Sequence, residues 1–166
     1  ARRQRQLCIR EGSIRVHRAE TGCLGYNGFP TPFCPSLNSV VVHGIPSDYR
    51  LQEGDILSVD CGTRLNGFYG DSAYTFAVGE ISLEAAKLLE VTKASLFKGI
   101  EQVAVGNRMG DIGNAVQTYA EARGFSVVRE MIGHGIGHNM HERPDVPNYG
   151  KRGHGPKLVN GMVICI

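Results

Sequence analysis

The dipeptide Asn66-Gly67 constrains the fold of this chain more than any other feature of its sequence. Asn-Gly between two apolar, β-branched runs is the strongest short signal for a β-hairpin with a two-residue turn. The runs at 56–59 and 68–78 fit the two strands of such a hairpin. Because a two-residue turn also fixes which residues of the strands face each other, the sequence predicts a hairpin of defined register.

Two aspartates fall on one face of this predicted hairpin. The register pairs Asp60 with Ala73, and Asp71 is two residues from Ala73, so both aspartates point to the same side. Their Cα atoms would be diagonal neighbours, roughly 7–8 Å apart. Aspartate is disfavoured in strands, and two carboxylates on a buried face are costly unless a cation neutralises them. The alternative to a shared metal site is that one aspartate faces solvent and the other caps a turn.

The rest of the pattern predicts an α+β fold, because strands and helices mix without regular βαβ alternation. The stretch 21–38, rich in glycine, proline and aromatic residues, predicts turns and a pocket wall. We expect further strands at 40–43, 125–129 and 162–166, a helix that Ser82 caps and that ends before Gly106, and a helix that Asp111 caps and that stops at Gly124.

The composition argues against several classes of function. Lys plus Arg is 18 against 16 Asp plus Glu, a formal charge of +2, which does not indicate a nucleic-acid or membrane-surface protein. No apolar run approaches the ~18 residues of a membrane span. The five cysteines include no Cys-x-x-Cys pair. We therefore expect neither a disulfide framework nor a zinc knuckle, and a reducing compartment is the simplest interpretation.

His134 is the candidate metal ligand among the six histidines, and it lies between Gly133 and Gly135. The glycines between His134 and His138 disfavour a helical His-x-x-x-His zinc site, because each costs ~1 kcal/mol in a helix. A glycine-lined strand or loop that presents His134 to a cleft fits better. An ordinary surface or hydrogen-bonded histidine is the alternative. Two carboxylates and one imidazole would suit Mn, Fe, Co or Zn.

Taken together, these motifs resemble those of type I, bacterial-type methionine aminopeptidases. The resemblance rests on Val-Val-His-Gly-Ile-Pro at 41–46, Val-Asp at 59–60, Phe-Tyr-Gly-Asp at 68–71, Gly-His-Gly-Ile-Gly at 133–137 and His-Glu-Arg-Pro at 141–144. It extends over about 23–166, and the set is specific although each motif alone is weak.

The resemblance implies a pita-bread fold, with two pseudo-symmetric α/β halves around a centre of two divalent metal ions (Co, Mn, Fe or Zn). By position it implies that Asp60, Asp71 and His134 bind metal. It also implies that His43 and His141 contact the peptide during catalysis. The pocket for the methionine side chain would be formed by Cys23, Tyr26, Phe29, Cys34 and Met140.

The implied activity is removal of the N-terminal methionine from newly made proteins, by attack of a metal-bridging water on the first peptide bond. We expect a cytoplasmic, ribosome-proximal monomer that acts on nascent polypeptides, without stable nucleic-acid binding and without a membrane. Two alternatives are an Xaa-Pro aminopeptidase or prolidase relative, and a non-catalytic binding module that kept the fold.

We expect 1–166 to be a single, incomplete catalytic domain, with a basic segment at 1–20 and a family-matching core at 21–166. In the family, the strand that matches 161–166 leads directly to a glutamate ligand, and a second glutamate follows further on. Because Ile166 is one residue short of the first glutamate, we expect a fragment cut near both ends that is inactive by itself.

Overall fold

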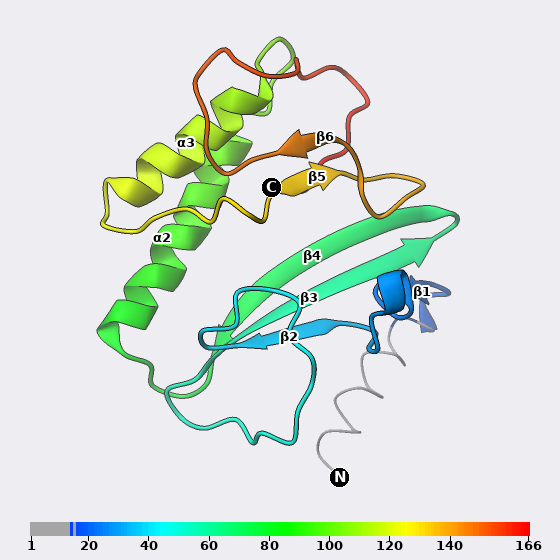
Figure 1. Ribbon diagram of the computed structural model, residues 1–166, viewed down its shortest axis with the longest axis vertical. Coiled ribbons are helices and arrows are strands. Elements are labelled where there is room, and N and C mark those ends of the chain that lie inside the picture. The colour runs from blue at the N-terminus through cyan, green and yellow to red at the C-terminus, as the bar shows by residue number, and fades with distance from the viewer. Residues whose placement is uncertain (1–13, 15) are drawn as a thin grey trace. The chain divides into compact units, whose positions relative to one another are not determined.

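The structure, a computed structural model, describes residue 14 and residues 16–166, and these form two compact units (Figure 1). The first unit holds the described residues up to Ser82 together with Gly137–Met140. The second holds Leu83–Ile136 and His141–Ile166. Most of the basic segment expected at 1–20 lies outside the described residues.

The first unit is built on an antiparallel sheet around one long central strand, β3. Strand β4 pairs with β3 along its full length on one edge, so β1 and β2 share the other edge. A short 3₁₀ helix, η1, lies between β1 and β2 in the chain. The elements are β1 (Glu20–Thr21), η1 (Tyr26–Gly28), β2 (Cys34–Leu37), β3 (Ile56–Leu65) and β4 (Phe68–Ala77).

The β3–β4 hairpin has the register that the Asn-Gly turn predicts. Asp60 pairs with Ala73, as expected. Asn66 and Gly67 both have positive φ angles, 52° and 85°, which a type I′ turn requires at its two central residues. The predicted hairpin is therefore confirmed, and its first strand continues beyond the expected 56–59 to the turn itself.

The prediction of a strand at 40–43 is wrong. The three valines of this run are 46, 62 and 38% exposed, so they meet neither a sheet partner nor a core. The place beside β3 is taken by β2, which lies in the stretch for which the sequence predicts turns. Its residues Cys34 and Ser36 are buried. Strand propensity reflects fit to a half-buried surface, and here a neighbouring segment occupies that surface.

The second unit confirms both predicted helices, α2 (Leu83–Ile100) and α3 (Met109–Glu121), which pack against each other. Helix α3 begins two residues before Asp111, so Asp111 lies in its first turn rather than at the cap position. Its carboxylate still accepts a hydrogen bond from the backbone N–H of Arg108 at 2.8 Å.

Among the described residues, neither of these helices is long and apolar enough to cross a membrane. The buried core comprises Met109, Ile112, Val146 and Leu158.

A two-stranded sheet of β5 (Gly133–Gly135) and β6 (Glu142–Val146) completes the second unit. The strand predicted at 125–129 is wrong, because the residues that find a pairing partner are those of β5, a few positions further along. Strand β6 was missed because Pro144 interrupts its pattern. The run at 162–166 makes a single bridge, from Ile164 to Gly135, rather than a strand.

Candidate active site

The two aspartates lie on one face of the β3–β4 hairpin in the first unit. Asp71 is directly opposite Gly62, which is two residues from Asp60 on β3, so Asp60, Gly62 and Asp71 share this face. Strand β2 adds Cys34, which is the pairing partner of Asp60 on the other edge of β3. Both aspartates are half-buried. The predicted juxtaposition of the two carboxylates is thus present, and their role as metal ligands stays a prediction.

A buried sulfur cluster lies beside these carboxylates in the same unit. Cys23, Cys34 and Met140 are only 8, 4 and 5% exposed and contact one another, and Tyr26 and Phe29 pack against them. These are the five residues for which the resemblance implies a pocket, so the structure brings the whole set together. Met140 can join this cluster because the segment Gly137–Met140 belongs to the first unit. The residues on either side of that segment belong to the second unit.

The two buried thiols are held in their neutral form. Burial, followed by the neighbouring Cys23 and Asp60, raises the pKa of the Cys34 thiol to about 12. Burial also raises the pKa of Cys23, where Asp60 and Asp71 act in the same direction and a hydrogen bond from the Gly62 N–H to Sγ, at 3.4 Å, acts in the opposite one. The pairing of Cys34 with Asp60 and the hydrogen bond of Cys23 to Gly62 place the cluster next to the aspartate face.

Tyr69 is a member of the cluster that the sequence analysis missed. Its ring packs against the buried sulfur residues, and its backbone N–H donates to the carbonyl oxygen of Gly137 at 2.8 Å. The signal that could have found it is strand alternation, because Tyr69 is two residues from Asp71 and therefore shares its face. The hydrogen bond also ties β4 to the segment that carries Met140.

His43 has an unusual backbone and an exposed side chain. Its φ is 55°, a left-handed conformation that is uncommon for residues other than glycine. The adjacent Gly44 is buried, and its N–H donates to Ser36 Oγ at 3.1 Å. Gly44 thereby fixes His43 next to β2, and the proposed contact of His43 with a peptide stays a prediction.

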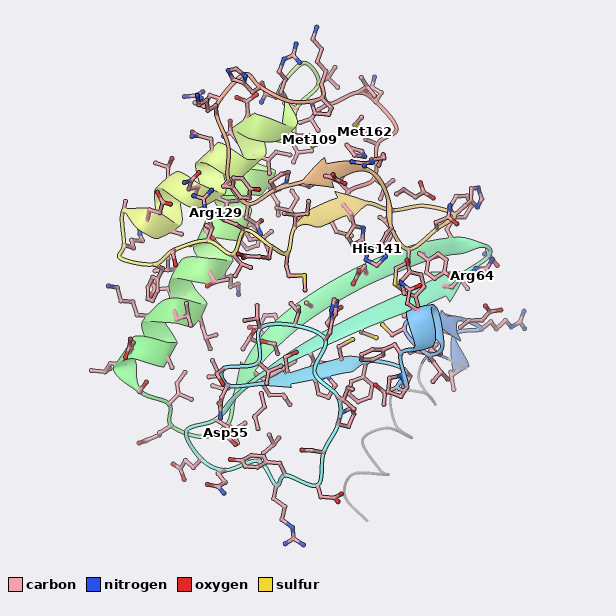
Figure 2. All side chains as sticks on the ribbon, in the orientation of Figure 1. Asp55, Arg64, Met109, Arg129, His141 and Met162 are labelled. Atoms are coloured by element: carbon pink, nitrogen blue, oxygen red, sulfur yellow. The ribbon has the colours of Figure 1, made fainter. Side chains whose placement is uncertain are left out.

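His134 and His141 lie together in the second unit. Strand β5 carries His134, and His141 directly precedes β6 (Figure 2); the two ring centroids are 4.2 Å apart. His134 Nδ1 lies 2.9 Å from the carbonyl oxygen of Gly135. Since a carbonyl oxygen only accepts, this contact favours the tautomer with its proton on Nδ1, and that tautomer would leave Nε2 to bind a cation. A cavity of about 330 Å³ is lined by both histidines, with Glu142, Arg143 and Asp145.

The donor chemistry fits a divalent transition metal. Asp60 and Asp71 offer carboxylate oxygens in the first unit, and His134 offers an imidazole nitrogen in the second. Oxygen and imidazole donors of this kind suit Mn, Fe, Co or Zn. The thiols of Cys23 and Cys34, with their raised pKa values, are poor ligands by comparison, because a thiol must lose its proton to bind metal.

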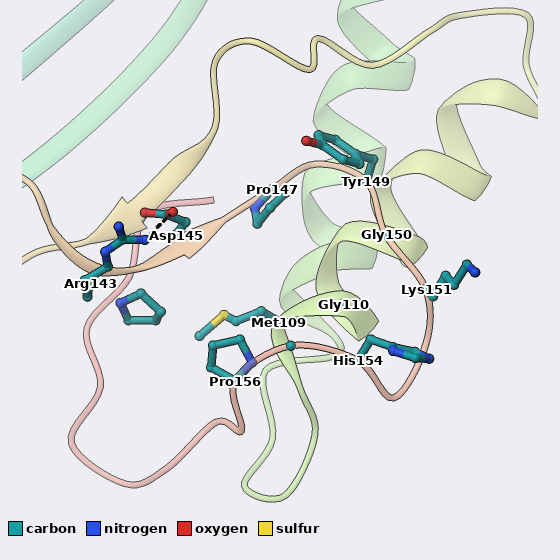
Figure 3. A pocket seen from close by; sticks show the side chains of 12 residues that line it. Met109, Gly110, Arg143, Asp145, Pro147, Tyr149, Gly150, Lys151, His154 and Pro156 are labelled. Carbon is teal, nitrogen blue, oxygen red and sulfur yellow. Dashed lines mark hydrogen bonds and ion pairs between the residues drawn. The ribbon is translucent and has the colours of Figure 1, made fainter.

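A larger cavity, of about 430 Å³, lies elsewhere in the second unit (Figure 3). It is bordered by Met109 at the start of α3, by Pro147 and Pro156, and by the ion pair between Arg143 and Asp145. Only this ion pair is shared with the cavity of the two histidines. None of the candidate catalytic or pocket residues lines it.

Two half-buried carboxylates on one sheet face, and a histidine whose Nδ1 lies at hydrogen-bonding distance from a backbone carbonyl oxygen, offer the kinds of ligand that a metal-dependent hydrolase uses. Residues 6–166 match the model of metallopeptidase family M24, and the chain therefore belongs to that family.

Within the family, the chain is similar to methionine aminopeptidases. It is 57% identical over 159 residues to the methionine aminopeptidase of Clostridium acetobutylicum, an alignment that covers 95% of this chain and 64% of the relative. The crystal structure of methionine aminopeptidase from Rickettsia prowazekii matches with a TM-score of 0.94 at 41% identity, over 98% of this chain and 65% of that one. A prolidase structure from Thermococcus sibiricus matches with a TM-score of 0.70 at 25% identity, over 80% of this chain and 36% of that one.

These comparisons confirm the resemblance to type I methionine aminopeptidases and the α+β pita-bread fold that it implies. The chain is more similar to these methionine aminopeptidases than to the prolidase, which shares the fold at lower sequence identity. The chain spans 64% of the length of the Clostridium acetobutylicum relative.

Proposed function

We propose that the protein to which this chain belongs is a metal-dependent methionine aminopeptidase, which removes the N-terminal methionine from newly made proteins. The observation that carries the proposal is the hairpin register, which sets Asp60 and Asp71 on one face beside a buried cluster of sulfur and aromatic side chains. A hydrolytic centre next to a pocket for one apolar side chain is what this cleavage requires. The similarity to methionine aminopeptidases supports the same conclusion.

Asp60, Asp71 and His134 would be three of the ligands of two divalent cations, of Co, Mn, Fe or Zn. When bound, such ions lower the pKa of the attacking water and polarise the carbonyl group of the scissile peptide bond. The two carboxylates lie on one rigid hairpin, so their separation is set by strand pairing rather than by a loop. With Nδ1 hydrogen-bonded to the Gly135 carbonyl oxygen, the His134 imidazole would offer Nε2 to a cation.

His141 and His43 would bind the peptide backbone. The ring of His141 is tilted against the His134 ring with the two centroids 4.2 Å apart, so a substrate group held near His134 would come within reach of an N–H of His141. An N–H donor at this position stabilises negative charge that develops on the carbonyl oxygen. His43, with its exposed ring on a tightly anchored backbone, would orient the substrate.

The sulfur pocket would take the methionine side chain. Its thiols are uncharged at neutral pH because their pKa values are raised, so the pocket offers an apolar surface to a thioether. Sulfur and aromatic atoms contact each other favourably, which suits Tyr26, Phe29 and Tyr69 in this role. A small apolar pocket would select methionine over longer or branched side chains, with a discrimination of about 1–3 kcal/mol per methylene.

The test is peptide hydrolysis by the purified whole protein. With Mn or Co added, we expect release of methionine from Met-Ala-Ser and no cleavage of Ala-Pro-Ala, with loss of activity in EDTA. Asp60→Asn and Asp71→Asn should each abolish turnover and weaken metal binding in calorimetry, whereas Asp48→Asn, at an exposed carboxylate, should do neither. Cleavage of Ala-Pro-Ala instead would identify a prolidase relative, and no turnover with any metal would favour a binding module.

The substrates, the location in the cell and the oligomeric state are predictions that we base on the proposed activity. We propose nascent polypeptides as substrates, a cytoplasmic, ribosome-proximal location, and a monomer without stable nucleic-acid or membrane binding. Sedimentation of the whole protein would check the oligomeric state. The inactivity of residues 1–166 by themselves also stays a prediction, and turnover of Met-Gly-Ser by that piece would contradict it.

A further inference from the structure

Two glycines lie under the tip of Met140 in the first unit. A Cβ atom built on Gly22 or on Gly62 would lie 2.6 Å from the terminal methyl carbon of Met140. Real Cβ atoms essentially never approach another heavy atom within 3.0 Å. The Met140 methyl therefore occupies space that exists only because both positions lack a side chain. The two glycines also contact each other, since the N–H of Gly22 donates to the carbonyl oxygen of Gly62 at 2.8 Å.

Neither glycine is needed for backbone conformation. Both lie outside the left-handed region that favours glycine, in contrast to Gly67 at the hairpin turn. Gly62 is moreover in the interior of β3, where glycine weakens a strand because it adds conformational entropy to the unfolded chain and packs nothing. A strand-interior glycine of this kind commonly marks close approach of another group. Here the approaching group is the Met140 methyl.

We propose that Gly22 and Gly62 determine the width of the substrate pocket, acting through Met140. This inference rests on the proposed function, in which the cluster of Cys23, Cys34 and Met140 receives the first side chain of the substrate. With no Cβ beneath it, the Met140 side chain lies back against the sheet and leaves the pocket open to a long, unbranched side chain. A Cβ at either position pushes the methyl off the sheet and into the pocket.

Position 62 offers the cleaner test of the two. An alanine there meets the flexible end of Met140 and, at 3.3 Å, the Cys23 sulfur, so the structure can accommodate it by moving Met140. An alanine at position 22 also meets backbone, with the carbonyl carbon of Gly62 at 2.9 Å and its oxygen at 3.1 Å. That backbone cannot withdraw without disturbing β3. The two variants therefore differ in whether a change at position 140 can rescue them.

The experiment is a double-mutant cycle in the whole protein, with Gly62→Ala, Met140→Ala and the double variant. The kcat/KM is measured, with saturating Mn, on peptides that begin with methionine, norleucine and alanine. We expect Gly62→Ala to lower kcat/KM about tenfold for methionine and norleucine and much less for alanine. In the Met140→Ala background the same substitution should change none of the three by more than about twofold, because the methyl that it displaces is gone.

Two further variants are controls. Gly22→Ala should stay impaired in the Met140→Ala background, because its contact with the Gly62 backbone remains. Gly70→Ala, on β4, places a Cβ no closer than 3.6 Å to any neighbour, so its effect should be small and independent of position 140.

The same variants are also unfolded in urea, which separates this inference from the proposed function. Coupled stabilities with an unchanged substrate profile would overturn the pocket-sizing role. Additive effects of Gly62→Ala and Met140→Ala on both stability and kcat/KM would overturn the contact itself. If the unsubstituted protein cleaves none of the peptides with any metal, the proposed function fails and the pocket-sizing role fails with it. The urea cycle then still decides whether the glycines make room for Met140.

Discussion

Replacing Gly113 by alanine is expected to destabilise the protein, even though alanine is the better helix former. Gly113 lies inside α3 and faces the loop that follows β6. A Cβ atom built on it would lie 2.5 Å from the carbonyl oxygen of Pro147 and closer still to that of Tyr149. Because both neighbours are backbone atoms, no side chain can turn aside, and the loop itself has to move away from the helix.

The magnitude follows from what holds that loop. Asn114 Nδ2 donates to the Gly150 carbonyl oxygen at 3.1 Å, and the Gly150 N–H donates to Gln117 Oε1 at 3.2 Å. Overpacking costs about 1–3 kcal/mol, and backbone neighbours tied in this way place Gly113→Ala near the upper value. Alanine regains about 1 kcal/mol of helix propensity. The net loss is about 2 kcal/mol, which at about 2–4 °C per kcal/mol lowers Tm by roughly 4–8 °C.

The assay is thermal and urea unfolding of the purified whole protein. Thr118→Ala, at an exposed position of the same helix, is the matched control and should be slightly more stable than the parent, since it gains helix propensity without a new contact. The reasoning is refuted if Gly113→Ala is as stable as the parent or more stable. That result would mean that α3 and the loop do not approach as closely as the structure has them.

Three further predictions concern single side chains. Met140→Ala should cost about 2–5 kcal/mol in urea unfolding, because it empties a buried position, and a loss below ~1 kcal/mol would contradict its burial. The Cys34 thiol, with its pKa raised to about 12, should react with iodoacetamide at pH 8 in EDTA at least ~100-fold more slowly than a small free thiol, as followed by mass spectrometry. Hydrogen bonds from the N–H groups of Arg108 and Gly153 lower the pKa of Asp111, so its stabilising effect is present above the unfolded pKa of about 3.9 and is lost as pH falls through the lower folded value. Asp111→Asn should therefore be less stable than the parent at pH 7 in urea unfolding, with a gap that closes in acid, and equal stabilities at pH 7 would contradict this.

The hairpin could be predicted from sequence because its determinants are local. Two residues with positive φ set the turn, and strand alternation then places Asp60 and Asp71 without any tertiary information. The helices were predictable for the same reason, since periodicity and stop signals act within one segment. The hairpin register and the positions of the two helices could therefore be predicted from the sequence, and the register alone placed part of the candidate site.

The pairing partners of short strands could not be predicted in this way. The valine run at 40–43 and the apolar run at 125–129 have strand-like composition, yet β2 and β5 form the pairs. Which of two neighbouring segments joins a sheet depends on the packing of the whole unit, which a local pattern does not contain. Tyr69 was missed for a related reason. Its contact with the pocket arises because Gly137–Met140, distant in sequence, packs in the first unit.

Strand β3 shows why local preference fails where the candidate site lies. Asp60 and Gly62 are both poor strand residues, and they occupy consecutive positions on one face of an otherwise well-formed strand. Asp60 places a half-buried charge beside Asp71, and Gly62 leaves space beneath Met140. β-Branched residues at both positions would make a better strand, but they would remove a carboxylate and fill the space beneath Met140. When two neighbouring positions on one face both depart from strand preference, and each departure serves a different chemical need, we attribute them to function rather than to folding.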